Sequence, residues 1–194
     1  WPSAALLQGL NTALFDLIER GPIDPAEVAS LRVPLSTQAF DMHGKLPVYR
    51  GKFDALISGH YTAAIALIDR ALTLKQYEPA RYDDPAVRRF AEHKVAMRPD
   101  AALSGVETAV EVELAGGRTL TARCVHPRGS LENPLSRAQV EDKFRTYAPE
   151  RLSASAIDAI VEAIDRLEET GSARTLMGLL RQAPGDRTQS LAAE

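Results

Sequence analysis

The chain has 194 residues, of which 45% are hydrophobic and 25% are charged, a composition typical of a globular protein of one or two domains. Its net charge of -3 at pH 7 gives no basic surface for nucleic acid or for an anionic membrane. No apolar run approaches the ~20 residues that span a bilayer, and no signal peptide is visible. The single cysteine, Cys124, excludes an internal disulfide and favours a reducing compartment. We therefore expect a cytoplasmic protein.

The first residues predict a helix that begins almost at once. Apolar residues recur at spacings of three and four from Leu6 onward, and the pattern ends near Arg20, before Gly21 and Pro22. A natural N-terminus seldom enters a helix so abruptly. We therefore expect the chain to be the C-terminal piece of a longer protein, cut or processed just before Trp1.

A strand and a long loop are expected next. Residues 31–35 are extended in pattern, and Pro34 lacks the amide hydrogen that an interior strand needs, so this strand is predicted to be short or to lie at a sheet edge. Residues 36–51 carry turn-forming residues around Gly44 and Pro47 and predict a loop. Loops of this length are often functional or mobile.

Two further helices are expected in the middle of the chain. Apolar residues and alanines predict a helix over residues 57–72. A second helix is predicted from Asp84, an N-cap residue that Pro85 follows, to about His93.

The clearest strand signal is a hairpin over residues 106–125. Apolar residues alternate with polar ones up to Leu114, and Gly116-Gly117 turns the chain into a second alternating segment. Residues 95–97 suggest a further short strand. Glutamates on the first hairpin strand are expected to face solvent, without a chemical role.

From Ser136 onward the pattern is purely helical. Ser136 and Gln139 have the spacing of a capping box, and Pro134 cannot lie inside the helix that follows. Apolar residues at 157–167 share one helical face, and residues 173–181 predict a shorter helix. A boundary between an α+β unit and a helical tail is therefore expected near residue 130.

Known metal and nucleotide motifs are absent from the sequence. The four histidines are scattered without metal-ligand spacing, and there is no HExxH, CxxC or Cys/His cluster. No GxGxxG or Walker-type loop follows a strand, and no GxSxG elbow occurs. Cys124 lies in the alternating hairpin and is expected to be a packed strand residue. We expect no metal and no cofactor.

Several segments, in the same order along the chain, resemble motifs of the MmgE/PrpD family. Residues 129–144 resemble G-x-P-x-N-P-L-S…KF, with Asn-Pro-Leu-Ser at 133–136 and Lys-Phe at 143–144. Residues 55–61 resemble A-K-F-S-x-x-Y, and residues 82–95 resemble DP.V..L..KV. The first two residues resemble the end of K-x-[YF]-P, whose lysine would lie just upstream.

The resemblance implies an enzyme with a large all-helical domain and a smaller α+β domain, the lid. The expected fold class is α+β: residues 1–130 form the lid, with an antiparallel hairpin-containing sheet packed by helices. Residues 131–183 are C-terminal helices that belong to a separate all-α domain, otherwise absent from this chain. Residues 184–194 are expected to be a disordered tail.

The resemblance also implies a function. Family members act on di- and tricarboxylic acids without a metal or organic cofactor, using acid–base residues between the two domains. The chain is thus expected to be part of a lyase that resembles 2-methylcitrate dehydratase of propionate metabolism. The alternatives are a decarboxylase or an epimerase of the same family, or a non-catalytic α+β module for dimerisation or ligand binding. The expected partners are a small carboxylic acid, the missing N-terminal helical domain and a second copy in a homodimer, with neither nucleic acid nor a membrane.

Three positions depart from what the decarboxylases of the family have. Ala4 and Gln8 stand where histidines are expected, and Gln38 stands where a tyrosine is expected after the first strand. A glutamine can hydrogen-bond a carboxylate, but it cannot carry a proton. These departures weaken the case for decarboxylation.

No residue is predicted with confidence to be catalytic, but eight polar residues are candidates for binding the substrate. They are Gln8, Gln38, His43, Arg50, Lys52, Ser58, His60 and Tyr61. Arg50, Lys52 and His60 are expected to point toward a common cleft, because a polyanionic substrate needs cations. The alternatives are a solvated loop charge for Arg50 and Lys52, a surface or capping side chain for His60, and a helix N-terminus for Ser58. By itself the chain is expected to be inactive and not to remain a free monomer.

Overall fold

The computed structural model describes residues 1–169 and 172–181. The chain divides into two compact units, Trp1–Pro134 and Leu135–Glu194. The division thus falls a little after the boundary expected near residue 130. The tail that is expected to be disordered, residues 184–194, lies outside the described residues.

The first unit begins with a 3-10 turn, Ala5–Leu7, that leads into helix α1, Gln8–Arg20. Its other helices are α2 Thr37–His43, α3 Lys52–Ile57, α4 Gly59–Asp69, α5 Pro79–Tyr82 and α6 Pro85–His93. Its strands are β1 Val28–Leu35, β2 Val95–Pro99, β3 Thr108–Leu114 and β4 Thr119–Cys124. The ends predicted for α1 and α6 are confirmed, and Asp84 caps α6 by accepting a 2.8 Å hydrogen bond from the Ala86 amide.

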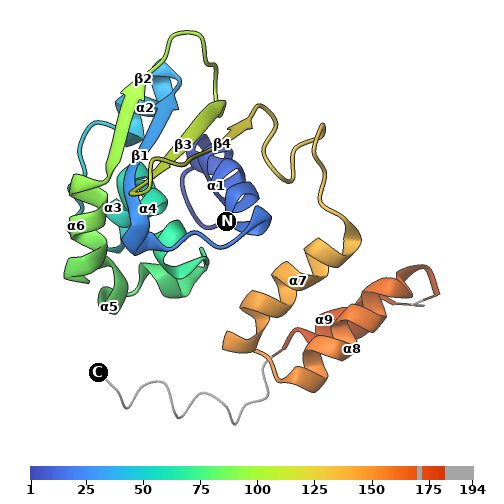
Figure 1. Cartoon of the computed structure of the whole chain (residues 1–194). Coiled ribbons are helices and arrows are strands. Elements are labelled where there is room, and N and C mark those ends of the chain that lie inside the picture. The colour runs from blue at the N-terminus through green and yellow to red at the C-terminus, as the bar shows by residue number, and fades with distance from the viewer. Residues whose placement is uncertain (170–171, 182–194) are drawn as a thin grey trace. The chain divides into compact units, whose positions relative to one another are not determined.

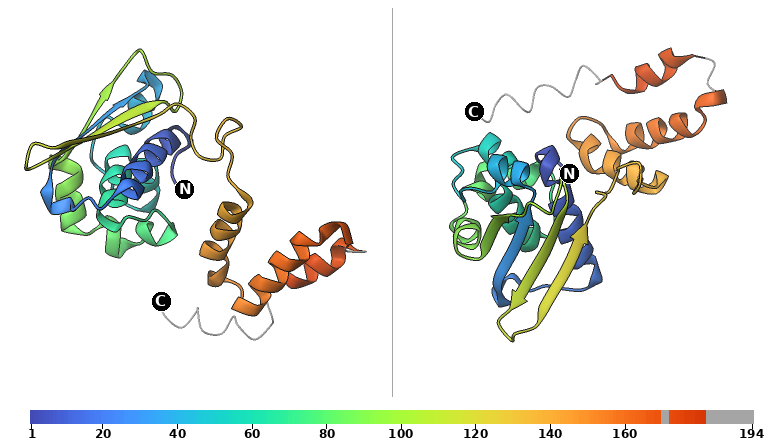
Figure 2. Two further views of the ribbon diagram at one scale, coloured as in Figure 1. Left: turned by 45° about the vertical axis from the view of Figure 1, so that its right-hand side comes forward. Right: turned by 90° about the horizontal axis from the view of Figure 1, so that it is seen from above.

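The strands form one mixed sheet in the order β2-β1-β3-β4 (Figures 1 and 2). β3 and β4 pair antiparallel, which confirms the hairpin predicted over residues 106–125. β1 pairs antiparallel with β3 and parallel with β2. A parallel pair needs a crossover connection, and helices α2 to α6 form it. The expected α+β fold class is confirmed.

Strand β1 corrects one prediction, because it is interior to the sheet and eight residues long. Pro34 therefore marks neither an edge nor a short strand. Proline cannot donate to a neighbouring strand, but its carbonyl accepts a 2.7 Å hydrogen bond from the buried hydroxyl of Thr108 on β3. A side-chain donor thus holds β1 and β3 together where the proline interrupts the regular ladder.

The loop predicted over residues 36–51 is also corrected, because α2 occupies its first half. The Ser36 hydroxyl accepts a 3.3 Å hydrogen bond from the Ala39 amide and caps the helix. Ala39 and His43, one turn apart, are both buried. A helix of seven residues is too short to be stable by local propensity, so packing decides whether it forms. Residues 44–51 have neither helix nor strand.

The helix predicted over residues 57–72 is confirmed as α4, Gly59–Asp69, which Ser58 begins by accepting a 3.2 Å hydrogen bond from the Tyr61 amide. A separate short helix that the sequence pattern did not predict, α3, ends just before it at Ile57. Arg70, in the left-handed region at φ 51°, ends α4. Every residue from 59 to 67 is buried, so α4 is a central helix rather than an amphipathic surface helix.

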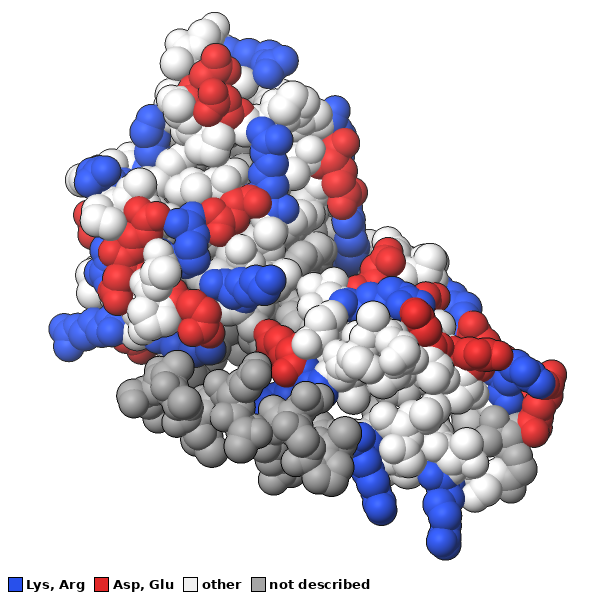
Figure 3. Space-filling view, turned by 90° about the horizontal axis from the view of Figure 1, so that it is seen from below, with Lys and Arg blue, Asp and Glu red and all other residues white. Residues whose placement is uncertain are grey.

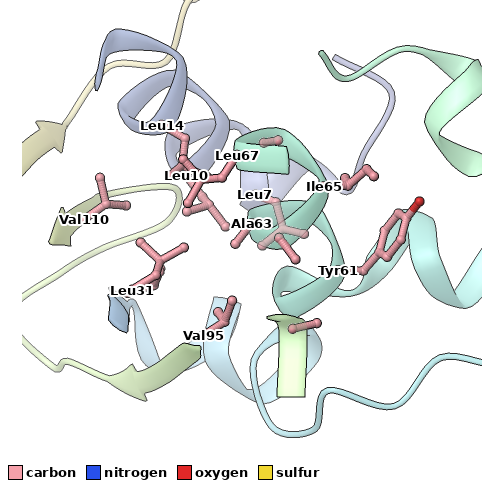
Figure 4. Packing of buried hydrophobic residues seen from close by; sticks show 14 of the residues in the cluster. Leu7, Leu10, Leu14, Leu31, Tyr61, Ala63, Ile65, Leu67, Val95 and Val110 are labelled. Atoms are coloured by element: carbon pink, nitrogen blue, oxygen red, sulfur yellow. The ribbon is translucent and has the colours of Figure 1, made fainter. Parts of the chain in front are cut away.

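The core lies between the sheet and helices α1 and α4. Leu10 and Leu14 of α1 lie beside Leu67 of α4 and point toward Leu31 and Val110 of the sheet (Figure 4). All five are at most 1% exposed. Each such side chain stabilises the fold by roughly 1.5–3 kcal/mol relative to an exposed one.

The second unit contains helices α7 Arg137–Tyr147, α8 Ala154–Asp165 and α9 Ala173–Leu179. The capping box predicted at Ser136 and Gln139 is confirmed. Burial in this unit is sparse: Ile157 and Ile160 of α8 are buried, whereas Ile164 is 46% exposed. Figure 3 shows uncharged side chains gathered over part of this unit, with charged ones around them.

No helix in the described part of the chain is long and apolar enough to cross a membrane.

Candidate functional site

The candidate site is a groove beside the irregular segment that joins α2 to α3, and we call it the His43 groove. Its volume is about 300 Å³, within the size range of small-molecule sites. It is lined by Met42, His43, Lys45, Leu46, Val48, Asp54, Ile57 and Ser58. Of the eight predicted substrate-binding residues, the structure brings His43 and Ser58 together here.

Two capped helix ends build the groove. His43 is the last residue of α2, and Ser58 is the cap of α4. Gly59, next to that cap, lets the two helices approach closely: a Cβ atom there would lie 2.9 Å from the His43 carbonyl oxygen and 2.7 Å from the Met97 sulfur. A larger residue at position 59 would therefore push α4 away from the groove.

The imidazole of His43 is oriented by the backbone. Nδ1 lies 2.8 Å from the carbonyl oxygen of Ile57, and because a carbonyl oxygen only accepts, Nδ1 carries the hydrogen when the ring is neutral. Nε2 has no hydrogen-bond partner among the described residues. In this tautomer Nε2 is the basic nitrogen, and it is the atom left free to exchange a proton with a ligand.

Opposite charges accompany His43 in the groove. Asp54 accepts a 3.1 Å hydrogen bond from the backbone amide of Arg50, which fixes the end of the irregular segment. Lys45 pairs with Asp41 at 2.9 Å, and both side chains are more than half exposed. Exposed pairs of this kind contribute little stability, so Lys45 can turn toward an anionic ligand at small cost. The sequence analysis did not include Lys45 and Asp54 among the candidates. They come close to His43 only because of the path that residues 44–51 take between α2 and α3.

The expected convergence of Arg50, Lys52 and His60 receives no support from the geometry. Arg50 is exposed, and Lys52 is exposed and bonded through Nζ to Glu78 at 2.7 Å. His60 is only 6% exposed, and its Nδ1 is buried without a hydrogen-bond partner. Burial lowers the pKa of His60 to about 4, so its ring is neutral near pH 7. None of the three lines the His43 groove, and their role in binding stays a prediction.

Tyr61 is part of a buried tyrosine cluster. Its ring meets Tyr49 edge-on, with centroids 4.8 Å apart, and lies 5.7 Å from Tyr77. Its hydroxyl donates to the carbonyl of Gln76. Desolvation raises the pKa of Tyr61, so the phenol stays protonated. These contacts describe a packing residue.

The two glutamines lie apart from the groove. Gln8 donates from Nε2 to the Trp1 carbonyl and to the Ser3 hydroxyl, each at 3.1 Å, and so holds the first residues against α1. Gln38 is exposed on the first turn of α2. Neither lines the His43 groove, and their contact with a substrate also stays a prediction.

Metal binding is not indicated by the described residues: none of their His, Cys, Asp and Glu side chains form a group of three or more that could hold an ion.

Comparisons with known proteins identify the family. The model of the MmgE/PrpD C-terminal domain matches residues 1–169. Cis-aconitate decarboxylase of Mus musculus is 24% identical over 163 residues, which cover 82% of this chain and 32% of the relative. Cis-aconitate decarboxylase of Homo sapiens is 26% identical over 131 residues, which cover 66% of this chain and 27% of the relative. The chain thus spans about a third of the length of these relatives. The family expected from the sequence motifs is confirmed: the chain belongs to the MmgE/PrpD family, as its C-terminal domain.

Proposed function

We propose that this chain is the lid part of a lyase that acts on a di- or tricarboxylic acid, and that His43 carries a proton in the reaction. The observation that carries the proposal is the 2.8 Å contact between His43 Nδ1 and the Ile57 carbonyl, which leaves Nε2 available. An elimination next to a carboxylate needs a base for the carbon-bound proton and an acid for the leaving hydroxyl. An imidazole serves as the base in its neutral form and as the acid in its protonated form.

Dehydration of a 2-methylcitrate-like substrate is the reaction we propose first. Gln8 and Gln38, where the decarboxylases of the family are expected to have a histidine and a tyrosine, supply no proton. His43 is then the titratable group that this chain offers in its groove beside the acid Asp54. The remaining groups come from the N-terminal helical domain that we propose as the partner of this chain.

Decarboxylation is the second candidate, and the relatives favour it, since both are named cis-aconitate decarboxylase. In that reaction the electron pair left when CO₂ departs must be taken up by a proton on the carbanion, and a protonated His43 is a suitable acid. The two candidates differ in the product, so one assay with both substrates separates them.

The test combines binding with turnover. The 194-residue chain is mixed with the helical domain of a family member, and turnover of 2-methylcitrate and of cis-aconitate is measured against pH. The test variant is His43→Asn, because the asparagine amide replaces the Nδ1 donor but cannot carry a proton in the reaction. We expect kcat to fall by about 10²-fold or more. The part of the pH dependence of kcat that depends on this histidine should disappear. His93→Asn, at a histidine whose side chain is 73% exposed outside the groove, is the matched control.

The chain alone is expected to show no turnover. Nitrogen NMR of the free chain should nevertheless show His43 protonated on Nδ1, with Nε2 shifting when 2-methylcitrate is added. A His43→Asn variant with unchanged kcat and pH profile would exclude the proposed role of His43. Binding of the acids without turnover by any reconstituted pair would favour a non-catalytic ligand-binding module.

A further inference from the structure

The outer face of the sheet has a second hollow, far in sequence from the His43 groove. Helices α1 and α4 pack on the other face (Figure 2). The outer face carries the alternate residues of the strands, which range from buried Pro34 to exposed Arg98 and Arg123. A hollow of about 570 Å³ lies there. Its lining residues are Arg20, Arg32, Pro34, Arg98, Ala109, Val110, Glu111, Thr121, Ala122 and Arg123.

Strand register explains the shape of this hollow. Pro34 of β1 lies opposite Arg98 of β2, and Ala109 of β3 lies opposite Arg123 of β4. Pro34 and Ala109 occupy adjacent central strands, so one row across the sheet has an arginine at each end and two small residues between. Three strand spacings of about 4.8 Å place the Cα atoms of the two arginines about 14 Å apart. Pro34 is buried and Ala109 is half-buried, and both line the hollow between the two arginines.

The charges on this face are not balanced among the described residues. Arg32 is bonded to Glu111 and, at 2.9 Å, to Glu113. Arg20 donates to the Thr121 carbonyl at 3.1 Å and forms no ion pair with a described carboxylate. Arg98 and Arg123 are exposed and have no partner in the described part of the chain. Four arginines and one carboxylate thus line a hollow in a chain whose net charge is -3.

We propose that this hollow, the sheet-face site, binds a small polyanion with at least two carboxylate or phosphate groups. Guanidinium groups bind both kinds of anion through paired, charge-assisted hydrogen bonds. Arg98 and Arg123 hold the two ends of the ligand, and Pro34 and Ala109 accommodate its uncharged middle. Arg32 also lines the hollow, but it is already bonded to Glu111 and Glu113 and is not assigned to the ligand. No residue is shared with the His43 groove, so the site does not depend on the proposed reaction.

The test is a titration of the 194-residue chain, followed by amide NMR and calorimetry at physiological salt. The probes are citrate and inorganic tripolyphosphate, with acetate as the single-anion comparison. We expect at least one polyanion to shift the amides of β1, β3 and β4, and acetate at equal concentration to leave them unchanged. Binding of citrate alone identifies a carboxylate ligand, and binding of tripolyphosphate alone identifies a phosphate ligand.

Variants assign the binding to individual side chains. Arg98→Gln and Arg123→Gln should each weaken binding about tenfold, the effect of one charge-assisted contact. Both arginines lack partners, so these variants should unfold at the same urea concentration as the parent. Glu111→Gln removes the one carboxylate that lines the hollow and should tighten binding several-fold.

A matched control completes the test. Arg89→Gln, at an exposed arginine of α6 outside the hollow, should leave the affinity unchanged. The proposal is overturned if neither polyanion binds, if acetate reproduces the shifts, or if Arg89→Gln weakens binding as much as Arg98→Gln does.

Discussion

The two units of the chain use similar apolar patterns but reach different degrees of burial. In the first unit, Leu10 and Leu14 of α1 are completely buried, because a sheet and α4 lie against that face. In the second unit, α8 also has an apolar face, yet Ile164 is 46% exposed, and Leu167, in the 3-10 turn just after α8, is 50% exposed. An amphipathic pattern therefore predicts a helix in both units, but a closed core forms only where other elements cover the apolar face. The first unit supplies these elements itself, and we propose that the second unit needs a partner.

The largest expected effect contrasts a buried residue of the first unit with a half-exposed residue of the second. Leu14→Ala should lower the free energy of unfolding of the first unit by about 3–5 kcal/mol, because it removes buried methyl groups and leaves a cavity. Ile164→Ala should change this free energy of unfolding by less than about 0.5 kcal/mol, because the Ile164 side chain is already half exposed. Urea unfolding followed by the fluorescence of Trp1, the single tryptophan of the chain, measures the first unit. Similar losses for both variants would contradict the contrast.

Acid should also act on the first unit more than on the second. His60 is buried in the first unit, and desolvation lowers its pKa to about 4 from 6.5. The unfolded chain therefore binds more protons than the folded one between pH 6.5 and 4, and stability falls as pH drops through this window. The difference in pKa corresponds to about 3 kcal/mol between pH 7 and pH 4.

Urea titrations of the parent chain and of His60→Asn at several pH values test this linkage. Carboxylates contribute to acid unfolding in both proteins, so the difference between them isolates His60. We expect the stability of the variant to fall by about 3 kcal/mol less than that of the parent over the window. Parallel curves for the two proteins would show that His60 is not desolvated.

The smallest expected effect concerns assembly of the second unit. We propose that the apolar face of α8 packs on a partner, either an N-terminal helical domain of the kind expected for the family or a second copy of this chain. Covering Ile164 and Leu167 should contribute about 1–2 kcal/mol for each half-exposed side chain. Replacing both by aspartate should therefore shift the chain toward monomer in sedimentation experiments and leave the Trp1 unfolding curve unchanged.

A matched surface change controls for added charge alone. The variant Ala138→Asp with Ala173→Asp adds the same charge at exposed positions of α7 and α9. It should leave the sedimentation behaviour as it is in the parent. If the parent chain sediments as a monomer at all concentrations, the proposal that the apolar face of α8 pairs with a second copy is wrong.

The predictions that hold depend on local patterns. The capped starts of α6 and α7 follow from Asp84-Pro85 and from the Ser136–Gln139 box, because a cap involves residues only three positions apart. The β3–β4 hairpin follows from alternation around a glycine turn. The family resemblance, which the match over residues 1–169 confirms, likewise rests on short segments in a fixed order.

The candidate site was only partly accessible to such reasoning. His43 and Ser58 are among the predicted residues and do line one groove, whereas Lys45 and Asp54 join them through the path of residues 44–51. His60 carries the same side chain as His43, yet one ring lies at a groove and the other is desolvated inside the unit. The type of residue indicates possible chemistry, but its surroundings set the pKa and the access of a ligand.

The sequence by itself determined the helices and strands with strong periodicity, their caps, the α+β class and the family. Only the tertiary structure decided that β1 is an interior strand despite Pro34 and that the short helices α2 and α3 exist. Each of these depends on contacts distant in sequence: Thr108 satisfies the carbonyl of Pro34 across 74 positions, and packing stabilises a helix too short to form alone. Periodicity and capping act over a few residues, whereas strand order, burial and the assembly of a site depend on which distant segments meet.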